Sequence, residues 1–354
     1  MGTSGSGAIG AETGSADVPR VLVAAGADGL RTADWPTEPP AAGRVRITTE
    51  CSLVSPGTEL HYLDQCRKTG AVQPLGYCAA GTVRDVGEGV PGLAPGDRVI
   101  AMGWNYAVHA DVVSVPWRLV QRVPDELPLT SAVVADIAAT AVHAGDRAGL
   151  RDGDEVLVVG AGLIGQLVAQ VARDRGAAVS VMERNPGRMA AAQRLGAASR
   201  EERSLTGPEP GEPTARRCVF VCATSDATQT LRAALAWAGR GPGRPVVVAV
   251  GRFSAGIEFS AELGNIDLRN SARCGTGYRD DDYVHGRRDL TPPEGEDTVD
   301  NNLARALDLV HRGAIRPEAM AIPHMPIAEA EYAYDLLRSR GDAVSVLFTY
   351  GSPA

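Results

Sequence analysis

The first third of the chain alternates short apolar runs with glycine and proline. Five such runs occur there: Val21–Ala24, Val45–Thr49, Gly81–Val86, Arg98–Met102 and Val112–Val115. Their length and the turn residues between them are typical of β-strands, and little of the stretch is helical in period. We therefore expect a small β-rich domain over residues 18–137.

The pattern of apolar residues changes after Pro128, from short strand-like runs to an alternation of helices and strands. Ser131–Ala148 is rich in alanine and permits a helix, and from Asp154 onward apolar strands alternate with amphipathic helices. The strands are expected at Val156–Val159, Val179–Met182, Cys218–Cys222 and Val246–Val250. Valine-rich runs of this kind are buried on both faces of a parallel sheet. The pattern predicts an α/β domain over residues 138–277.

Helix signals follow the first two of these strands. Ile164, Leu167, Val168, Val171 and Ala172 recur at helical spacing and form one apolar stripe. Asn185 as N-cap, Pro186 in the first turn and Gly196 past the end bound the next helix.

Residues 278–354 form a third segment, which we expect to return to the first domain. Arg279–Asn301 is charged and has no period, which predicts a long surface loop. Helices near Asn302–His311 and Ile327–Ser339 and a last strand at Ala343–Phe348 are expected after it.

Composition narrows the class of ligand. The 354 residues carry a net charge of -8, which argues against a nucleic acid or an anionic membrane as the main partner. No apolar run approaches the roughly 20 residues that span a bilayer. Residues 1–17 have no signal-peptide pattern and are expected to be a disordered leader. Six cysteines without CxxC spacing fit a reducing cytoplasm. Because the charge argues against nucleic acids and membranes, a small-molecule substrate is the default.

A glycine-rich turn, Gly160–Gly165, stands between the first strand of the α/β domain and its helix. The pattern GxGxxG is weak alone, but this strand-turn-helix position is the one that the dinucleotide fingerprint requires. Gly160 permits the tight turn, Gly162 lets the pyrophosphate approach, and Gly165 allows close packing. With Leu163 and Ile164, these glycines open a helix whose N-terminus attracts an anion. The sequence predicts a nicotinamide dinucleotide site.

Glu183 ends the second strand, close to the spacing of a carboxylate that binds the adenosine ribose. Such a carboxylate favours NAD over NADP because it repels a 2'-phosphate. Arg184 and Arg188 follow it and are alternative partners for that phosphate. NAD is therefore the expected cofactor, and NADP stays open.

Five motifs in fixed order make the chain resemble the medium-chain dehydrogenase/reductase family. They are Gly57–His61, Leu75–Val83, Gly96–Val99, Thr140–Ala141 and Gly160–Gly165. The resemblance implies an α/β protein with a GroES-like β-rich domain and a Rossmann doubly wound parallel sheet. Ser55–Leu60 looks most like the subgroup of bacteriochlorophyllide dehydrogenase-like enzymes.

The positions that match the family's catalytic zinc ligands hold other residues. Pro56 and Tyr77 stand where a cysteine and a histidine are usual, and Asp136 stands at the third position. The four cysteines of the structural zinc lobe are also missing. One carboxylate cannot hold a catalytic zinc, so we expect no zinc. Cys51, Cys66 and Cys78 as a substitute thiolate site are a weaker reading than buried free cysteines.

The resemblance also implies roles for individual residues. Thr58 contacts the substrate oxygen and His61 passes its proton to solvent, as in the zinc enzymes. Tyr77 is a candidate acid or oxyanion donor, and Asp136 orients these groups, receives a cationic substrate, or merely caps a helix. Thr140, Ala223, Val250 and Gly251 are expected around the cofactor.

Three functions follow from these residues. The first is a zinc-independent oxidoreductase that transfers a hydride between NAD(H) and a secondary alcohol or its ketone. The second is a conjugate reductase of C=C bonds, like the quinone and enoyl reductases, and the third is a nucleotide-binding protein without turnover. A homodimer is expected, paired through an edge strand near Ser271–Gly277.

Overall fold

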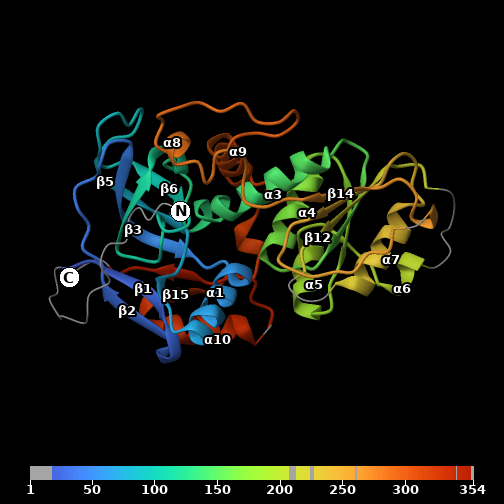
Figure 1. Ribbon diagram of the computed structural model, residues 1–354, viewed down its shortest axis with the longest axis horizontal. Coiled ribbons are helices and arrows are strands. Elements are labelled where there is room, and N and C mark those ends of the chain that lie inside the picture. Colours follow the sequence, from blue (N-terminus) through green and yellow to red (C-terminus); the bar gives the residue numbers. More distant parts are fainter. Residues whose placement is uncertain (1–17, 207–212, 224–226, 260, 340, 352–354) are drawn as a thin grey trace.

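The computed structural model describes residues 18–206, 213–223, 227–259, 261–339 and 341–351, so the expected leader lies outside the described residues. Two lobes lie side by side, with helix α3 (Val134–Ala148) between them (Figure 1). One lobe is rich in β-strands and the other alternates strands and helices, so the predicted fold class is confirmed. Within the described residues, no helix is long and apolar enough to cross a membrane.

The β-rich lobe holds two sheets. A three-stranded sheet has the order β2-β1-β4, and a seven-stranded sheet follows the path β15-β16-β3-β5-β6-β8, with β7 paired to β3. The strands from the first part of the chain are β1 (Arg20–Ala25), β2 (Leu30–Asp34), β3 (Arg44–Leu53), β4 (Val72–Pro74), β5 (Cys78–Val86), β6 (Arg98–Met102), β7 (Val112–Pro116) and β8 (Val120–Arg122). Helix α1 (Pro56–Thr69) connects β3 to β4, and the short helix α2 (Leu129–Ala132) precedes α3.

The second lobe is a six-stranded parallel sheet of order β11-β10-β9-β12-β13-β14. Its strands are β9 (Glu155–Val159), β10 (Ala178–Met182), β11 (Ala198–Ser199), β12 (Arg217–Val221), β13 (Val246–Ala249) and β14 (Asp267–Asn270). Its helices are α4 (Leu163–Asp174), α5 (Pro186–Arg194), α6 (Arg203–Thr206) and α7 (Thr228–Ala238). The chain reverses direction across the sheet between β9 and β12, and ligands of such sheets bind at the carboxyl ends of the strands there.

The last segment returns to the β-rich lobe. It holds α8 (Asp281–Val284), α9 (Val299–His311), β15 (His324–Pro326), α10 (Ala330–Arg338) and β16 (Leu347–Thr349). The expected strand at Ala343–Phe348 is wrong in its start, because only Leu347–Thr349 pairs with β3. Before it, the amide of Val344 bonds to Ala321 and the hydroxyl of Ser345 to Val54, which breaks the ladder pattern.

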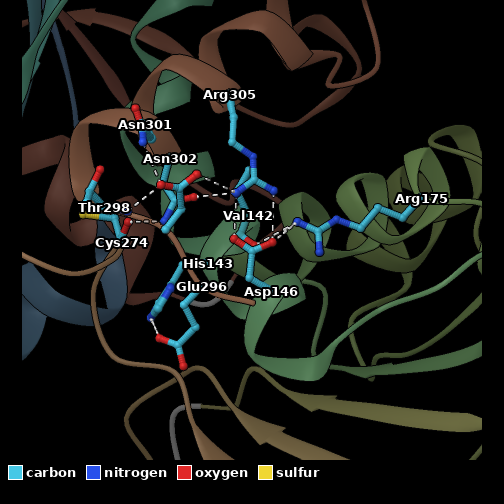
Figure 2. A network of polar contacts seen from close by, with 11 residues as sticks. Val142, His143, Asp146, Arg175, Cys274, Glu296, Thr298, Asn301, Asn302 and Arg305 are labelled. Carbon is cyan, nitrogen blue, oxygen red and sulfur yellow. Dashed lines mark hydrogen bonds and ion pairs between the residues drawn. The ribbon is translucent and has the colours of Figure 1, made fainter. Parts of the chain in front are cut away.

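The expected loop Arg279–Asn301 is anchored between the lobes. It contains α8, and α9 begins at Val299, inside the predicted range. Figure 2 shows Asp146 of α3 bound to Arg175 and to Arg305 of α9, each at 2.7 Å. Glu296 of the loop pairs with Arg147 of α3 and lies 3.9 Å from the Nε2 atom of His143. These ion pairs hold the loop and α9 against α3.

Candidate functional site

The glycine turn has the geometry that the sequence predicts. Gly160 has a φ of 94°, which favours glycine, and a Cβ atom added at Gly165 would lie 1.9 Å from the Gly160 carbonyl oxygen. A Cβ atom at Gly162 would meet nothing within 4 Å. Helix α4 begins at Leu163, so its free N–H groups start at this open side of the turn. The turn fits the pyrophosphate of a dinucleotide.

Glu183 lies directly beside this turn. It follows β10, and its Oε2 atom accepts a hydrogen bond of 2.7 Å from the amide of Ala161. Its Oε1 atom accepts from the amides of Arg184 and Asn185. Three backbone donors fix the carboxylate next to the glycines, and one acceptor position remains for a ribose hydroxyl.

The two arginines after Glu183 differ in their surroundings. Arg184 is exposed. Arg188 donates from Nε to the Gly341 carbonyl at 2.8 Å and from Nη2 to the Ala343 carbonyl at 3.1 Å. Sequence reasoning offered both arginines to a phosphate, but the structure commits Arg188 to the return segment. Asn185 caps α5 as predicted and accepts from the amide of Arg188.

Three of the residues expected near the nicotinamide, Ala223, Val250 and Gly251, follow the carboxyl ends of the neighbouring strands β12 and β13. A Cβ atom at Gly251 would be 2.4 Å from the Ala223 carbonyl, so these residues are in close contact. Val250 follows β13 rather than ending it, since the strand stops at Ala249. The amides of Val250 and Gly251 both bond to the Val221 carbonyl. Thr140 is partly exposed on α3.

Three hydroxyl groups meet at the start of α1. Tyr77 donates from its hydroxyl to the Oγ atom of Ser55 at 2.6 Å. Burial raises the pKa of Tyr77 well above its ordinary value, and its hydrogen bonding with Ser55 and Thr58 offsets part of that rise. Ser55 is the N-cap residue of α1, and Thr58 lies in its first turn. The sequence names Thr58 and Tyr77 as separate candidates for contact with the substrate oxygen, but it does not single out Ser55.

His61 lies one turn beyond Thr58 on the same helix. Desolvation lowers its pKa, and the charges of Arg252 and Lys68 lower it further, while Asp64 opposes them. Arg252 follows Gly251 in the second lobe. The influence of its charge indicates that this face of α1 approaches the carboxyl edge of the parallel sheet.

Aromatic rings flank the hydroxyl groups. The rings of Tyr62 and Trp104 have centroids 4.4 Å apart, and those of Tyr77 and Trp104 are 5.9 Å apart. All three side chains are partly exposed. They give the site a wall on which the carbon skeleton of a substrate can pack.

A buried hydrogen-bond network supports the start of α1. Glu59 accepts from the amide of Ser55 at 2.6 Å, and its Oε2 atom lies 2.9 Å from Nε2 of His109. Nδ1 of His109 lies 2.7 Å from Oγ of Ser52, and the hydroxyl of Tyr334 also donates to Glu59. Glu59, His109 and Ser52 are fully buried, so they fix the helix rather than meet a substrate. The partners are far apart in sequence, and no motif announces them.

Asp136 does not fit the roles considered for it. It is the third residue of α3, whose N-cap is Val133, so it caps no helix. The side chain is buried, and no group in the described part of the chain meets hydrogen-bond geometry with either oxygen. Burial raises its pKa well above the ordinary value, and the Ala79 backbone offsets this only in part. Burial thus favours the neutral form of Asp136, which makes it a poor binding group for a cationic substrate.

The cysteines are placed singly in the core of the described residues. All six are free and buried. Desolvation raises the pKa of Cys51 to about 12, with smaller contributions from Glu50 and Asp136, which keeps it a thiol at neutral pH. Among the residues that the structure describes, no group of three or more His, Cys, Asp and Glu side chains is placed to hold a metal ion.

Comparisons of sequence find relatives among oxidoreductases. No family model matches the chain. The spectinabilin polyketide synthase system protein NorB of Streptomyces orinoci is 31% identical over 294 residues, which cover 79% of this chain but only 12% of that protein. The acryloyl-coenzyme A reductase of Metallosphaera sedula is 25% identical over 307 residues, which cover 78% of this chain and 82% of that enzyme.

A comparison of folds finds a solved structure with the same architecture. The alcohol dehydrogenase TADH from Thermus sp. ATN1 superimposes with a TM-score of 0.73 at 22% identity. The match covers 94% of this chain and all of that enzyme. The two-lobed arrangement is therefore shared over nearly the whole length.

Proposed function

We propose, from the premise that this chain belongs to the medium-chain dehydrogenase/reductase family, that it transfers a hydride between NAD(H) and a secondary alcohol or its ketone without a catalytic zinc. One observation carries the proposal: the hydroxyls of Tyr77, Ser55 and Thr58 lie together at the start of α1, and α1 approaches the carboxyl edge of the parallel sheet. Hydroxyl groups in this place can polarise a carbonyl and deliver a proton.

The zinc-free part of the proposal rests on the side chains at the three ligand positions. Pro56 has no donor atom, and the Tyr77 hydroxyl, whose pKa is raised, is not a thiolate, imidazole or carboxylate. Asp136 is buried as a neutral acid. A tetrahedral zinc needs three or four thiolate, imidazole or carboxylate ligands, so these residues do not fit it.

Each residue then has a defined task in ketone reduction. When bound, a nicotinamide cofactor supplies the hydride to the carbonyl carbon. Thr58 donates a hydrogen bond to the carbonyl oxygen, and Tyr77 donates another once its hydroxyl turns from Ser55 to the substrate. One of these hydroxyl protons passes to the oxygen as the alcohol forms. The depressed pKa of His61 keeps its ring neutral near pH 7, so it can relay a replacement proton from solvent.

Glu183 and Arg188 support NAD as the cofactor. The carboxylate of Glu183 lies at the glycine turn, where it can accept from a ribose hydroxyl. Arg188 is held by two carbonyl groups of the return segment, which leaves it less free for a 2'-phosphate. We propose NADH rather than NADPH on this ground.

Reduction of an activated C=C bond is the second candidate. Acryloyl-coenzyme A reductase is a relative over most of both chains, and such a reaction needs no Lewis acid at the carbonyl. A nucleotide-binding protein without turnover is the remaining alternative, and it leaves Tyr77 without a task.

We further propose a homodimer in the cytoplasm. The edge strand on this side of the parallel sheet is β14, at Asp267–Asn270 rather than at the expected Ser271–Gly277, and β11 forms the other edge. Leu268 on this strand is exposed, which suits pairing with a second copy. The buried free thiols suit a reducing compartment.

The test is a turnover assay on chelator-treated protein. NADH oxidation is followed at constant enzyme with a panel of ketones and of unsaturated carbonyl compounds, and zinc per chain is measured on the same sample. We expect turnover with ketones at far less than one zinc per chain, and a large loss in Tyr77→Phe. About one tightly held zinc per chain, with activity lost on its removal, would refute the zinc-free mechanism.

A further inference from the structure

A carboxylate from the return segment packs on the first turn of α5. Asp342 lies between α10 and β16 in sequence and is exposed. A Cβ atom added at Gly187 would lie 2.1 Å from its Oδ1 atom and 2.4 Å from its Oδ2 atom. Only glycine at this place lets the carboxylate approach so closely.

Arg188 holds this contact in place. Its guanidinium binds the carbonyl oxygens of Gly341 and Ala343, the two neighbours of Asp342 in the chain. Residues 341–343 are therefore fixed against the start of α5 by two charge-assisted hydrogen bonds. The contact joins the return segment to the nucleotide-binding lobe.

The place of this contact relates it to the cofactor. Helix α5 begins three residues after Glu183, whose carboxylate adjoins the glycine turn. In a Rossmann half, the segment that follows the second strand faces the adenosine ribose, and its charges separate NAD from NADP. Asp342 adds a second negative charge to this segment from another part of the chain.

We infer that Asp342 is a cofactor-specificity residue that disfavours NADPH. A 2'-phosphate carries a charge of about -1.5 to -2 at pH 7 and meets the carboxylates of both Glu183 and Asp342. Two of the donor groups of Arg188 are bound to backbone carbonyls, so fewer of them remain for such a phosphate. NADH lacks the phosphate and is unaffected by Asp342.

This inference rests on the proposed binding of a nicotinamide dinucleotide at the glycine turn. It adds to the role of Glu183, because the preference for NADH over NADPH then also depends on a contact between the return segment and the nucleotide-binding lobe. A purely structural role for Asp342 predicts a different outcome, since a neutral side chain of the same shape would preserve the packing on Gly187 and leave both affinities unchanged.

The experiment compares Asp342→Asn with the wild type in equilibrium titrations of NADH and of NADPH. The full-length protein is used, and binding is read from nicotinamide fluorescence, which needs no substrate. Asp125→Asn is the matched control, because it removes one exposed carboxylate beside β8 in the other lobe. Each titration is made at 0.1 M and at 1 M salt.

We expect Asp342→Asn to bind NADPH on the order of tenfold more tightly, and NADH within twofold of the wild type. The gain should shrink at 1 M salt, where the Debye length falls from about 10 Å to about 3 Å. Asp125→Asn should change neither affinity.

Other results overturn the inference. An unchanged NADPH affinity in Asp342→Asn means that Asp342 only packs, and an equal gain for both cofactors means that it blocks the site as a whole. If the wild type binds NADH but prefers NADPH, the inference on Asp342 and the choice of NADH are both wrong, while hydride transfer from a nicotinamide cofactor at this site stands. If the wild type binds neither cofactor, the proposed function itself fails.

Discussion

Replacing Asp136 by asparagine should stabilise the protein at neutral pH. Asp136 is only 1% exposed and, in the described part of the chain, no group meets hydrogen-bond geometry with either oxygen, although the Ala79 backbone favours the charged form to a small extent. Burial raises its pKa well above the ordinary value, so the folded protein holds the neutral acid. In the unfolded chain the group is in water and ionises near its reference pKa of about 3.9.

The direction of the pH dependence follows from proton binding. Between about pH 3.9 and the raised pKa, the folded state binds more protons than the unfolded state. Stability of the wild type therefore falls as pH rises through this window, by at most about 1.4 kcal/mol per pH unit. Asparagine has nearly the same shape and does not titrate, so the variant escapes this loss.

The expected gain at pH 7 is on the order of 1–3 kcal/mol, because the wild type loses up to about 1.4 kcal/mol for each pH unit of this window and asparagine loses none. For a domain of this size it corresponds to several degrees in the melting temperature, at about 2–4 °C per kcal/mol. Near pH 4 the two proteins should melt together, because both then hold a neutral side chain at residue 136.

Thermal unfolding of both proteins from pH 4 to pH 8 measures this difference. Asp125→Asn again serves as the control, because loss of an exposed carboxylate should change stability by less than about 0.5 kcal/mol. If Asp136→Asn is less stable than the wild type at pH 7, or if the difference does not vary with pH, Asp136 is ionised and paired in the folded protein and the reasoning is wrong.

Four further substitutions test the site. Thr58→Val should lower turnover with a ketone by roughly 10² to 10⁴ at nearly constant NADH affinity, since it removes a positioned proton-transfer group. His61→Ala should lose less turnover because water can replace an outer member of the relay, and equal rates in both variants and the wild type would argue against the relay. Glu183→Ala should weaken NADH binding by about tenfold and reduce the preference over NADPH, and titration of both cofactors checks this. Gly165→Ala should lose cofactor binding, because its Cβ would lie 1.9 Å from the Gly160 carbonyl oxygen, and a normal NADH titration in this variant would contradict the geometry of the turn.

The cofactor half was predictable from sequence because its signals are local. The glycine turn, its strand and its helix lie within about twenty residues, and the structure gives a steric reason for Gly160 and Gly165. Glu183 also falls beside the turn, as the parallel order of β9 and β10 requires. The spacing of apolar residues was enough to predict that these strands and helices exist. The ends of some elements, such as the start of β16, depend on partners that are distant in the sequence.

The catalytic half was less predictable because its contacts are distant in sequence. Ser55 bonds to Tyr77, and Glu59 to His109, across separations of 22 and 50 residues. Asp136 was considered as an orienting, binding or capping group, yet the packing of α3 buries it. Arg188 was offered to a phosphate, but Gly341 and Ala343 engage it from the far end of the chain. Such outcomes depend on tertiary packing, which residue types alone do not encode.

The central claim, hydride transfer from NADH to a carbonyl carbon without zinc, is tested most directly by isotope tracing. Zinc-free protein is incubated with NADH that carries deuterium at the transferable C4 position and with an unsaturated ketone that offers both a carbonyl carbon and a β carbon. The product is analysed by NMR for the position of the label. The account predicts deuterium on the carbinol carbon; deuterium on the β carbon, or transfer only after zinc is added, would contradict it.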